Sequence, residues 1–219
     1  MLTKQEFLDK IASGVRILDG ATGSNLRAKG MPNGCSTEQW VMKAGETRRF
    51  ADVSIQVLIT ADEKYPGGLI YTHNSRSAVI RATFTQDTYN TSDDKTALLF
   101  GDSGGDSRCK WMMTRYGSQI LKSDVMQVIH HGLAGGYLPI YQVVDPEIVL
   151  WPTPQSRFEG KWDSDSDGEY DDEYQWCTTA DFNAWLRDDS IRERQHHANG
   201  YTTVIDMSDL SVSVFYDYA

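Results

Sequence analysis

Cysteine is scarce in this chain of 219 residues, which has only Cys35, Cys109 and Cys177. Their number is odd, they lie far apart and no CxxC pair occurs, which argues against a disulfide framework and against a cysteine-rich zinc knuckle. Positive charge is also short, with 21 Lys and Arg against 31 Asp and Glu and a formal net charge of −10. Because clustered Lys and Arg drive phosphate binding, nucleic acid is not an expected partner.

Long apolar runs are absent as well. No stretch approaches 18 consecutive apolar residues, and the opening MLTKQEFLDKIASG lacks the apolar core of a signal peptide. With few cysteines and no membrane segment, we expect a cytoplasmic protein in a reducing compartment. The chain has 40% hydrophobic and 24% charged residues, which is typical of one globular domain with room for an appendage.

Two short apolar runs, Ala97 to Phe100 and Val125 to Ile129, are predicted to be buried strands. Each ends on residues that an apolar core would not select. The first is followed by Gly and Asp102, and the second by His130, His131 and a further Gly. An acid and an imidazole that leave adjacent strands at their carboxyl ends can converge on one point. The pattern therefore indicates a site for a divalent metal ion.

The order of motifs strengthens this interpretation. Asn-Ser-Arg-Ser at 74–77, LLFGD at 98–102, LKSD at 121–124 and HHGLAGG at 130–136 follow one another within residues 45–219. Together they resemble the second half of a metallo-β-lactamase-fold hydrolase of the ComEC-like branch. The resemblance implies an α/β fold, namely half of a four-layer αββα sandwich. It also implies zinc-dependent hydrolysis of an ester, an amide or a phosphodiester.

The same resemblance implies roles for individual residues. Asp102 would bridge zinc ions, His131 would ligate one of them, and His130 is the less favoured ligand. Asn74 and Ser77 would orient a loop or a substrate, although a strand-end cap explains them equally well. The family's other ligands come from an HxHxDH motif, which this chain lacks. Because catalytic zinc sites keep three protein ligands, we expect weak or substoichiometric zinc and an incomplete site.

Two alternatives to a hydrolase stay open. One is a non-catalytic remnant or interaction module that keeps the scaffold without the chemistry. The other follows from ILDGATGSNLRAKGMPNGCSTEQW at 17–40, which resembles the opening strand and loop of homocysteine S-methyltransferase barrels. That resemblance implies that Asp19 and Gly20 hold an amino acid substrate, but a barrel needs about 250 residues and a tight turn is the favoured interpretation. We therefore predict a chimeric chain, with an opening segment at 1–44 followed by the hydrolase-like residues 45–219.

Periodicity predicts the remaining elements. Strands are expected at 53–59 and 78–85, a helix after Gly104 that Gly117 weakens, and a short helix, a turn and a buried strand across 137–151. A helix capped by Thr178 or Thr179 and a closing hairpin of 201–207 with 211–216 follow. His196 and His197 are predicted to lie in a surface loop, with late metal ligation, together with His73, as the alternative. Asp124 is expected at the end of the sheet remote from the metal.

An acidic run, WDSDSDGEYDDEY, occupies 162–174. Asp163, Asp165 and Asp167 match the start of an EF-hand loop, but Tyr174 stands where a bidentate Glu is required. We expect a solvated loop.

Half of a sandwich also leaves one sheet face without its natural partner. The first 44 residues are too few to replace a sheet with its outer helices. We therefore expect a homodimer that pairs the two sheets, or else a complementary chain that carries the HxHxDH half.

Overall fold

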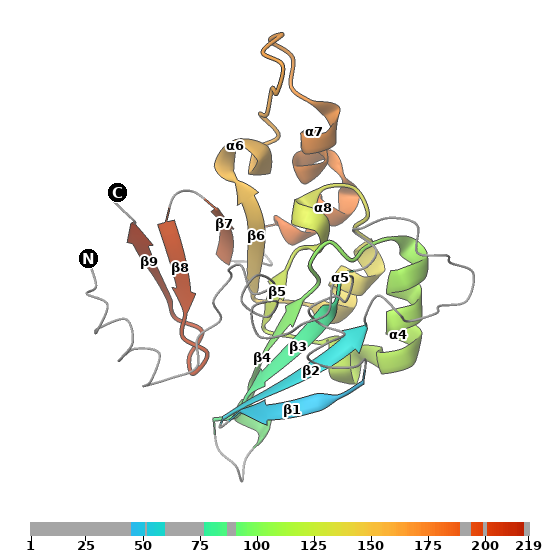
Figure 1. Cartoon of the computed structure of the whole chain (residues 1–219), viewed down its shortest axis with the longest axis vertical. Coiled ribbons are helices and arrows are strands. Elements are labelled where there is room, and N and C mark those ends of the chain that lie inside the picture. Colours follow the sequence, from blue (N-terminus) through green and yellow to red (C-terminus); the bar gives the residue numbers. More distant parts are fainter. Residues whose placement is uncertain are drawn as a thin grey trace, which may run out of the picture.

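The structure is a computed structural model that describes residues 45–50, 52–59, 77–86, 91–188, 194–198 and 201–216. Within these ranges seven strands form one sheet whose spatial order follows the chain order (Figure 1). They are β1 (Thr47–Phe50), β2 (Val53–Ile59), β3 (Val79–Phe84), β4 (Lys95–Leu99), β5 (Val125–Gln127), β6 (Ile148–Pro154) and β7 (Arg194–Ala198). Strands β1 to β4 pair antiparallel and β4 to β7 pair parallel, so the chain is mixed α/β. The predicted opening segment at 1–44 lies outside the described residues.

The central strands are buried on both faces. Leu98 and Met126 are neighbours in β4 and β5 and point into one core, whereas Ala97 and Val125 are neighbours that point into the other. Successive side chains of a strand alternate between the faces, so a strand covered on both sides needs an apolar residue at every position. This explains the consecutive apolar residues Ala97 to Leu99 in β4 and Val125 and Met126 in β5.

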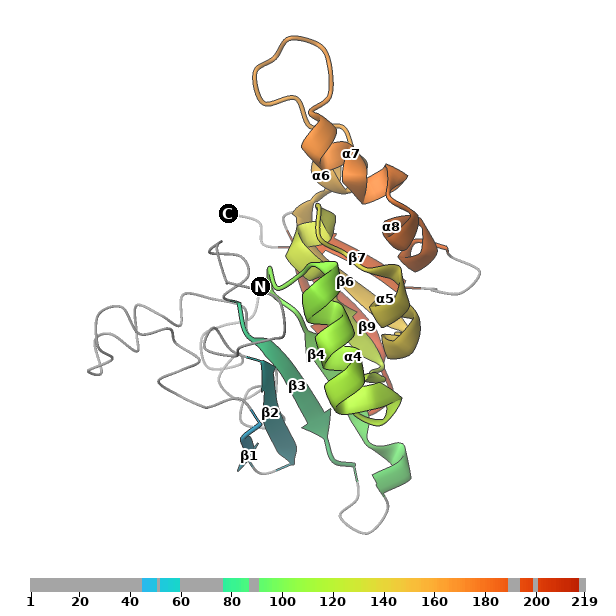
Figure 2. The ribbon, with the colours of Figure 1, turned by 90° about the vertical axis from the view of Figure 1, so that its right-hand side faces the viewer.

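Helices cover one face of the sheet (Figure 2). The helices in the described part of the chain are α4 (Asp106–Leu121), α5 (Leu138–Val144), α6 (Gln155–Phe158), α7 (Asp172–Thr179) and α8 (Asp181–Leu186), of which α4, α5 and α8 place fully buried side chains in the core on this face. Met112 of α4, Tyr141 of α5 and Leu186 of α8 are fully buried in the same core as Leu98. Short 3₁₀ turns occur at Thr91–Asp93 and Ile129–Gly132.

The other face has a partial cover from the end of the chain. Strands β8 (Tyr201–Ile205) and β9 (Val212–Tyr216) form the predicted closing hairpin as a second, two-stranded sheet. Met207 and Leu210, which connect them, are buried in one cluster with Val53, Phe84 and Ile148 of the large sheet. The chain thus shields part of the face that was expected to need a dimer partner. Self-association itself stays a prediction.

Three local predictions for the second half of the chain are wrong, at least in part. Thr178 and Thr179 do not cap a helix, because both lie in the last turn of α7 and their hydroxyls donate to the Gln175 carbonyl. The helix that follows begins at Asp181, after Ala180. The end of the acidic run was predicted to be a solvated loop, but residues 172–174 form the first turn of α7. The acidic side chains in this turn complement the positive end of the helix.

The third correction concerns His196 and His197. They lie in β7 and not in a loop, opposite Leu150 and Trp151 of β6. The backbone N–H and C=O groups along the outer edge of the buried strand β6 need hydrogen-bond partners. Pairing of β7 with β6 supplies them, and this outweighs the tendency of the neighbouring Ala-Asn-Gly to form a turn. Gly117, by contrast, interrupts α4 as the low helix propensity of glycine predicts, with φ 61° and ψ −177°.

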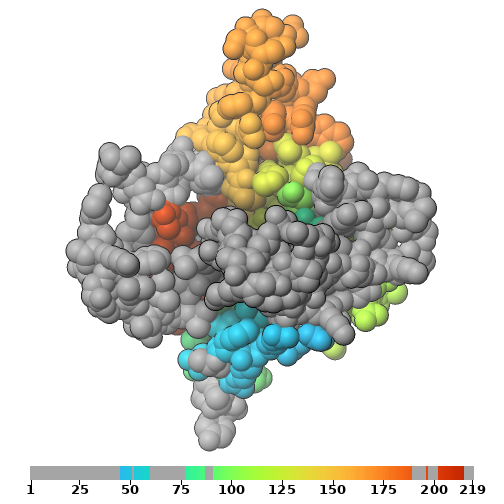
Figure 3. Space-filling view, in the orientation of Figure 1, coloured from blue at the N-terminus to red at the C-terminus, as the bar shows by residue number. Residues whose placement is uncertain are grey.

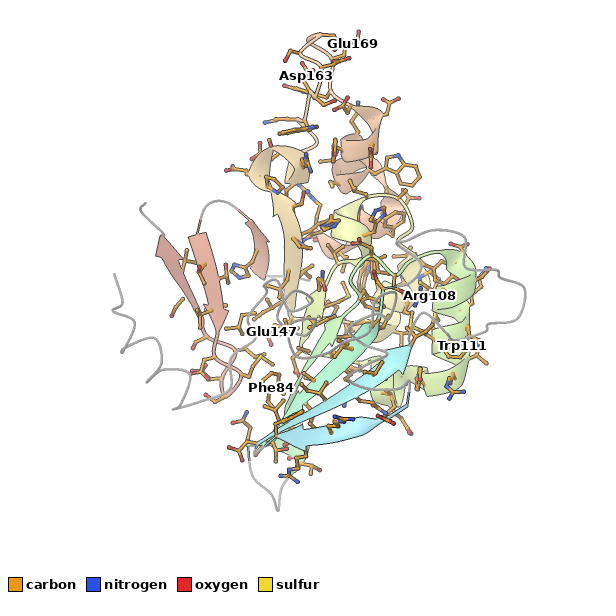
Figure 4. All side chains as sticks on the ribbon, viewed as in Figure 1. Phe84, Arg108, Trp111, Glu147, Asp163 and Glu169 are labelled. Carbon is orange, nitrogen blue, oxygen red and sulfur yellow. The ribbon has the colours of Figure 1, made fainter. Side chains whose placement is uncertain are left out.

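An arm of α6, α7 and the loop between them projects from one end of the sheet (Figures 1 and 3). At its base Arg157 lies 4.3 Å from the ring centre of Trp162 and 4.6 Å from that of Tyr174, which is cation–π geometry. Asp163 and Glu169 lie near its tip, far from Arg108 on α4 (Figure 4). No helix in the described part of the chain combines the length and the apolar character that crossing a membrane requires.

Candidate functional site

Asp102 and His131 meet at the carboxyl ends of two neighbouring parallel strands. Asp102 follows β4 and His131 follows β5, and these strands pair directly. The Nε2 atom of His131 lies 3.1 Å from Oδ1 of Asp102. Their side chains are 42% and 34% exposed, so the pair is open to solvent on one side. The convergence that the two motifs predicted is present in the structure.

Backbone contacts join the two motif loops. The His130 amide donates to the Gly101 carbonyl at 3.0 Å, and the Gly105 amide donates to the Gly135 carbonyl at 2.7 Å. A β-carbon on Gly104 would lie 2.5 Å from the Gly135 carbonyl oxygen, so only glycine permits this approach. The glycines of the two motifs therefore belong to one packed unit that sets the distance between the acid and the imidazole.

The histidine loop has an unusual backbone. His130 and His131 have φ values of 49° and 59°, in the left-handed region that residues with side chains rarely adopt. Gly132 follows at 84°. Each non-glycine residue held in such a conformation costs on the order of 1–3 kcal/mol, and strain of this kind clusters at functional sites. The loop thus stores strain at the residue whose ring faces Asp102.

The His131 ring is oriented by the backbone of β6. Its Nδ1 atom lies 2.7 Å from the Pro152 carbonyl oxygen, which can only accept a hydrogen bond, so Nδ1 carries a proton. In the neutral ring Nε2 then presents a lone pair to the carboxylate of Asp102. Two acceptors 3.1 Å apart need a shared cation, which is either a proton on Nε2 or a metal ion.

The pair fits the donor set and the spacing of zinc. Imidazole nitrogen and carboxylate oxygen are ordinary zinc ligands, and two such atoms on one tetrahedral ion lie about 3.3 Å apart. The observed separation is 3.1 Å. The hydrogen bond from Nδ1 to a carbonyl is the usual outer support of a ligating histidine. Within the described ranges no third His, Cys, Asp or Glu joins the pair in a group of metal-binding geometry.

His130 points elsewhere. Its Nδ1 atom is 2.9 Å from the carbonyl oxygen of Ala134, and its ring centre is 6.0 Å from that of His131. The structure thus gives His130 a contact within its own loop, and its place as the less favoured ligand stays a prediction.

Ser77 lies beside the acidic motif. A β-carbon built on Gly101 would be 3.2 Å from the Ser77 β-carbon, so the segment just before β3 contacts the turn that carries Asp102. The Ser77 carbonyl accepts a hydrogen bond of 2.8 Å from the buried guanidinium of Arg108. A substrate-binding role for Ser77 stays a prediction. Asn74 and His73 lie outside the described residues.

Asp124 has a structural role at the opposite end of the strands, as expected. Its Oδ2 atom accepts hydrogen bonds from the Thr96 amide at 2.7 Å and the Thr96 hydroxyl at 3.0 Å. These bonds tie the start of β4 to the residue before β5.

The acidic loop brings three carboxylates together. Ligand oxygens of Asp163, Asp165 and Asp167 all lie within 4.8 Å of one another. Amides of Ser166 and Gly168 donate to Asp163, at 2.6 Å and 3.0 Å. The grouping follows from these loop contacts, and it lies on the projecting arm, away from Asp102.

Sequence reasoning missed the groups that support His131 from behind. Pro152 contributes only a backbone carbonyl, for which no sequence signal exists. Asn183 of α8 donates to the Gly132 carbonyl, and the Cys177 thiol of α7 lies 3.9 Å from the His131 carbonyl. Burial raises the pKa of Cys177 to about 11, so this group stays a thiol near neutral pH. No sequence motif marks Asn183 either.

Comparison of the chain with protein-family models, with curated proteins and with solved structures found no match. The resemblances to metallo-β-lactamase-fold hydrolases and to the opening of homocysteine S-methyltransferases therefore stay predictions. What the site contributes independently is an acid and an imidazole held together by two interlocked loops.

Proposed function

We propose that this chain carries part of the metal site of a zinc-dependent hydrolase of the metallo-β-lactamase kind, with Asp102 and His131 as ligands. The observation that carries the proposal is the 3.1 Å approach of His131 Nε2 to Asp102 Oδ1 at the ends of adjacent parallel strands. An ester, an amide or a phosphodiester is the substrate class. The residues supply a place and an orientation for the metal, and solvent reaches both side chains.

The chain's own groups have distinct tasks in this proposal. Pro152 holds the Nδ1 proton and so directs the Nε2 lone pair outward. Asp102 contributes negative charge beside it, and the Gly101 carbonyl bound to the His130 amide keeps the two loops in register. Zinc, when bound, would supply a Lewis acid and activate a water molecule.

We extend the proposal to the architecture. The mixed sheet with helices on one face is compatible with one half of an αββα sandwich, and the remaining ligands would come from residues beyond the described ranges, from a second copy or from a complementary chain. A homodimer is our preferred arrangement. Cytoplasmic location belongs to the same proposal, since the sparse cysteines suit a reducing compartment.

One observation favours a second candidate, a non-catalytic scaffold or interaction module. In the described part of the chain the site offers two donors, fewer than the three that catalytic zinc sites use. In this case a proton shared by Asp102 and His131 satisfies the pair, and the strained loop is a remnant of former chemistry.

A substrate panel separates the two candidates. Phosphodiester, lactone and β-lactam substrates are incubated with the purified chain and added zinc or manganese. The hydrolase proposal predicts low turnover that is lost in Asp102→Asn. Asp124→Asn is the matched control, because this carboxylate lies at the other end of the strands, and it should keep the activity. Turnover that survives Asp102→Asn would contradict this site, and no turnover in any condition favours the scaffold.

A further inference from the structure

The loop that presents His131 is held by a segment that leaves the sheet and returns to it. Pro152 of β6 binds the ring, and the chain then runs through the arm to α8, where Asn183 reaches the next residue of the loop. The side-chain amide of Asn183 donates to the Gly132 carbonyl at 2.5 Å. Residues on both sides of the arm therefore contact the two consecutive positions 131 and 132.

Asn183 is fully buried and its amide orientation is set by its neighbours. Its nitrogen donates to two carbonyls, those of Gly132 and Trp176, the second at 2.8 Å. The opposite orientation would place the side-chain oxygen against two acceptors. In the observed orientation Oδ1 has no hydrogen-bond partner among the residues that the structure describes. Burying the Asn183 oxygen without a partner costs free energy, so the structure must gain from holding the two carbonyls in place.

The backbone of the histidine loop explains why the Gly132 carbonyl has to be held. Three consecutive residues, His130, His131 and Gly132, have positive φ, and such a conformation persists only where its surroundings over-determine it. The Gly132 carbonyl ends this run, so fixing it limits how far the peptide between Gly132 and Leu133 can rotate and holds the end of the run that contains His131. Trp151 leaves no room on the other side, since a β-carbon on Gly132 would approach its ring to 2.4 Å.

We propose that Asn183 is a positioning residue for His131, which by holding the Gly132 carbonyl keeps the imidazole directed at Asp102. Its effect on metal affinity rests on the proposed function above, whereas its effect on the loop does not. Outer supports of metal-ligating histidines typically contribute about 10–100-fold to metal affinity, and Asn183 is expected to act in this range.

The test compares Asn183→Leu, which has similar size and no donor, with Leu186→Ala. Leu186 lies in the same helix and is fully buried, and its side chain has no hydrogen-bonding group, so Leu186→Ala weakens only the apolar packing of α8. Cobalt(II) affinity is measured from its visible absorption bands. Amide hydrogen exchange compares Leu133, which donates to the His130 carbonyl, with Val128, which donates to the Leu150 carbonyl.

We expect Asn183→Leu to weaken cobalt binding at least about tenfold. The same variant should reduce the exchange protection of the Leu133 amide but not that of the Val128 amide. Leu186→Ala should bind cobalt within about twofold of the wild-type affinity. Unchanged affinity or unchanged Leu133 protection would overturn the positioning role, as would equal loss at both amides. If wild type binds no cobalt, the proposed function fails and the exchange data alone decide the positioning role. If Asn183→Leu does not fold, Asn183→Ser is measured against the same criteria.

Discussion

Gly132 is the residue of the histidine loop where a single methyl group should cost most. It has φ 84°, and a β-carbon there would lie 2.4 Å and 2.7 Å from two ring carbons of Trp151. Trp151 is 1% exposed, and its ring packs edge-on to Phe158 at 5.1 Å. The indole therefore has no free space into which it could retreat.

The magnitude for Gly132→Ala has two parts. A left-handed backbone conformation costs an alanine about 1–2 kcal/mol, and overpacking a well-filled core costs about 1–3 kcal/mol. We expect the free energy of unfolding to fall by about 2–5 kcal/mol. For a domain of this size that corresponds to a decrease in Tm of about 4–20 °C.

Gly168→Ala is the matched control, because Gly168 has a similar φ of 91° and a β-carbon added there would meet no other atom within 4 Å. It should lose only the conformational part, about 1–2 kcal/mol. Urea unfolding is measured for both variants and for each combined with Trp151→Leu, which isolates the clash with the indole. Removing the indole should recover about 1 kcal/mol or more of the lost free energy of unfolding in Gly132→Ala, and none in Gly168→Ala. The reasoning fails if the two glycine variants are equally stable, or if Trp151→Leu gives no such recovery.

The remaining predictions concern Asp124 and the buried thiols of Cys109 and Cys177. Asp124→Ala should lower the free energy of unfolding by about 1–3 kcal/mol, because the buried Thr96 amide loses its acceptor. Cobalt affinity should stay unchanged, and a loss of cobalt affinity in this variant would contradict a purely structural role. Burial raises the pKa of Cys109 to about 12 and of Cys177 to about 11. Both thiols should resist iodoacetamide at pH 8 in peptide mapping of the native protein, and rapid native labelling would contradict their burial. Because the unfolded chain ionises them from about pH 9, stability should fall as pH rises from about 9 to 12.

Local signals predicted much of the framework. Residues 53–59 form β2 with the predicted bounds, and the helix, turn and strand across 137–151 appear as α5, a left-handed Asp145 and β6. The closing hairpin is also present. These elements depend on side-chain periodicity and on turn residues, which are properties of neighbouring positions. The meeting of Asp102 and His131 followed from a rule on parallel strands and needed no long-range detail.

The misses arise from contacts between distant positions. Strand β7 exists because β6 offers it backbone partners, although its own residues, Arg194–Ala198, resemble a loop. The Pro152 carbonyl and the Asn183 amide support His131 from 21 and 52 residues further along the chain, and neither has a motif. The positive φ of two non-glycine histidines is likewise invisible to local propensity, because the tertiary packing imposes it.

Zinc binding by wild type and His131→Ala tests the central claim most directly. Equilibrium dialysis followed by elemental analysis should find weakly held zinc in wild type, at no more than about one ion per chain, and none above background in His131→Ala. Asp163→Asn is the control for metal held by the three carboxylates of the acidic loop, and it should bind zinc as wild type does. Zinc that persists in His131→Ala and disappears in Asp163→Asn, or a wild-type chain that binds none, would contradict a metal site at Asp102 and His131.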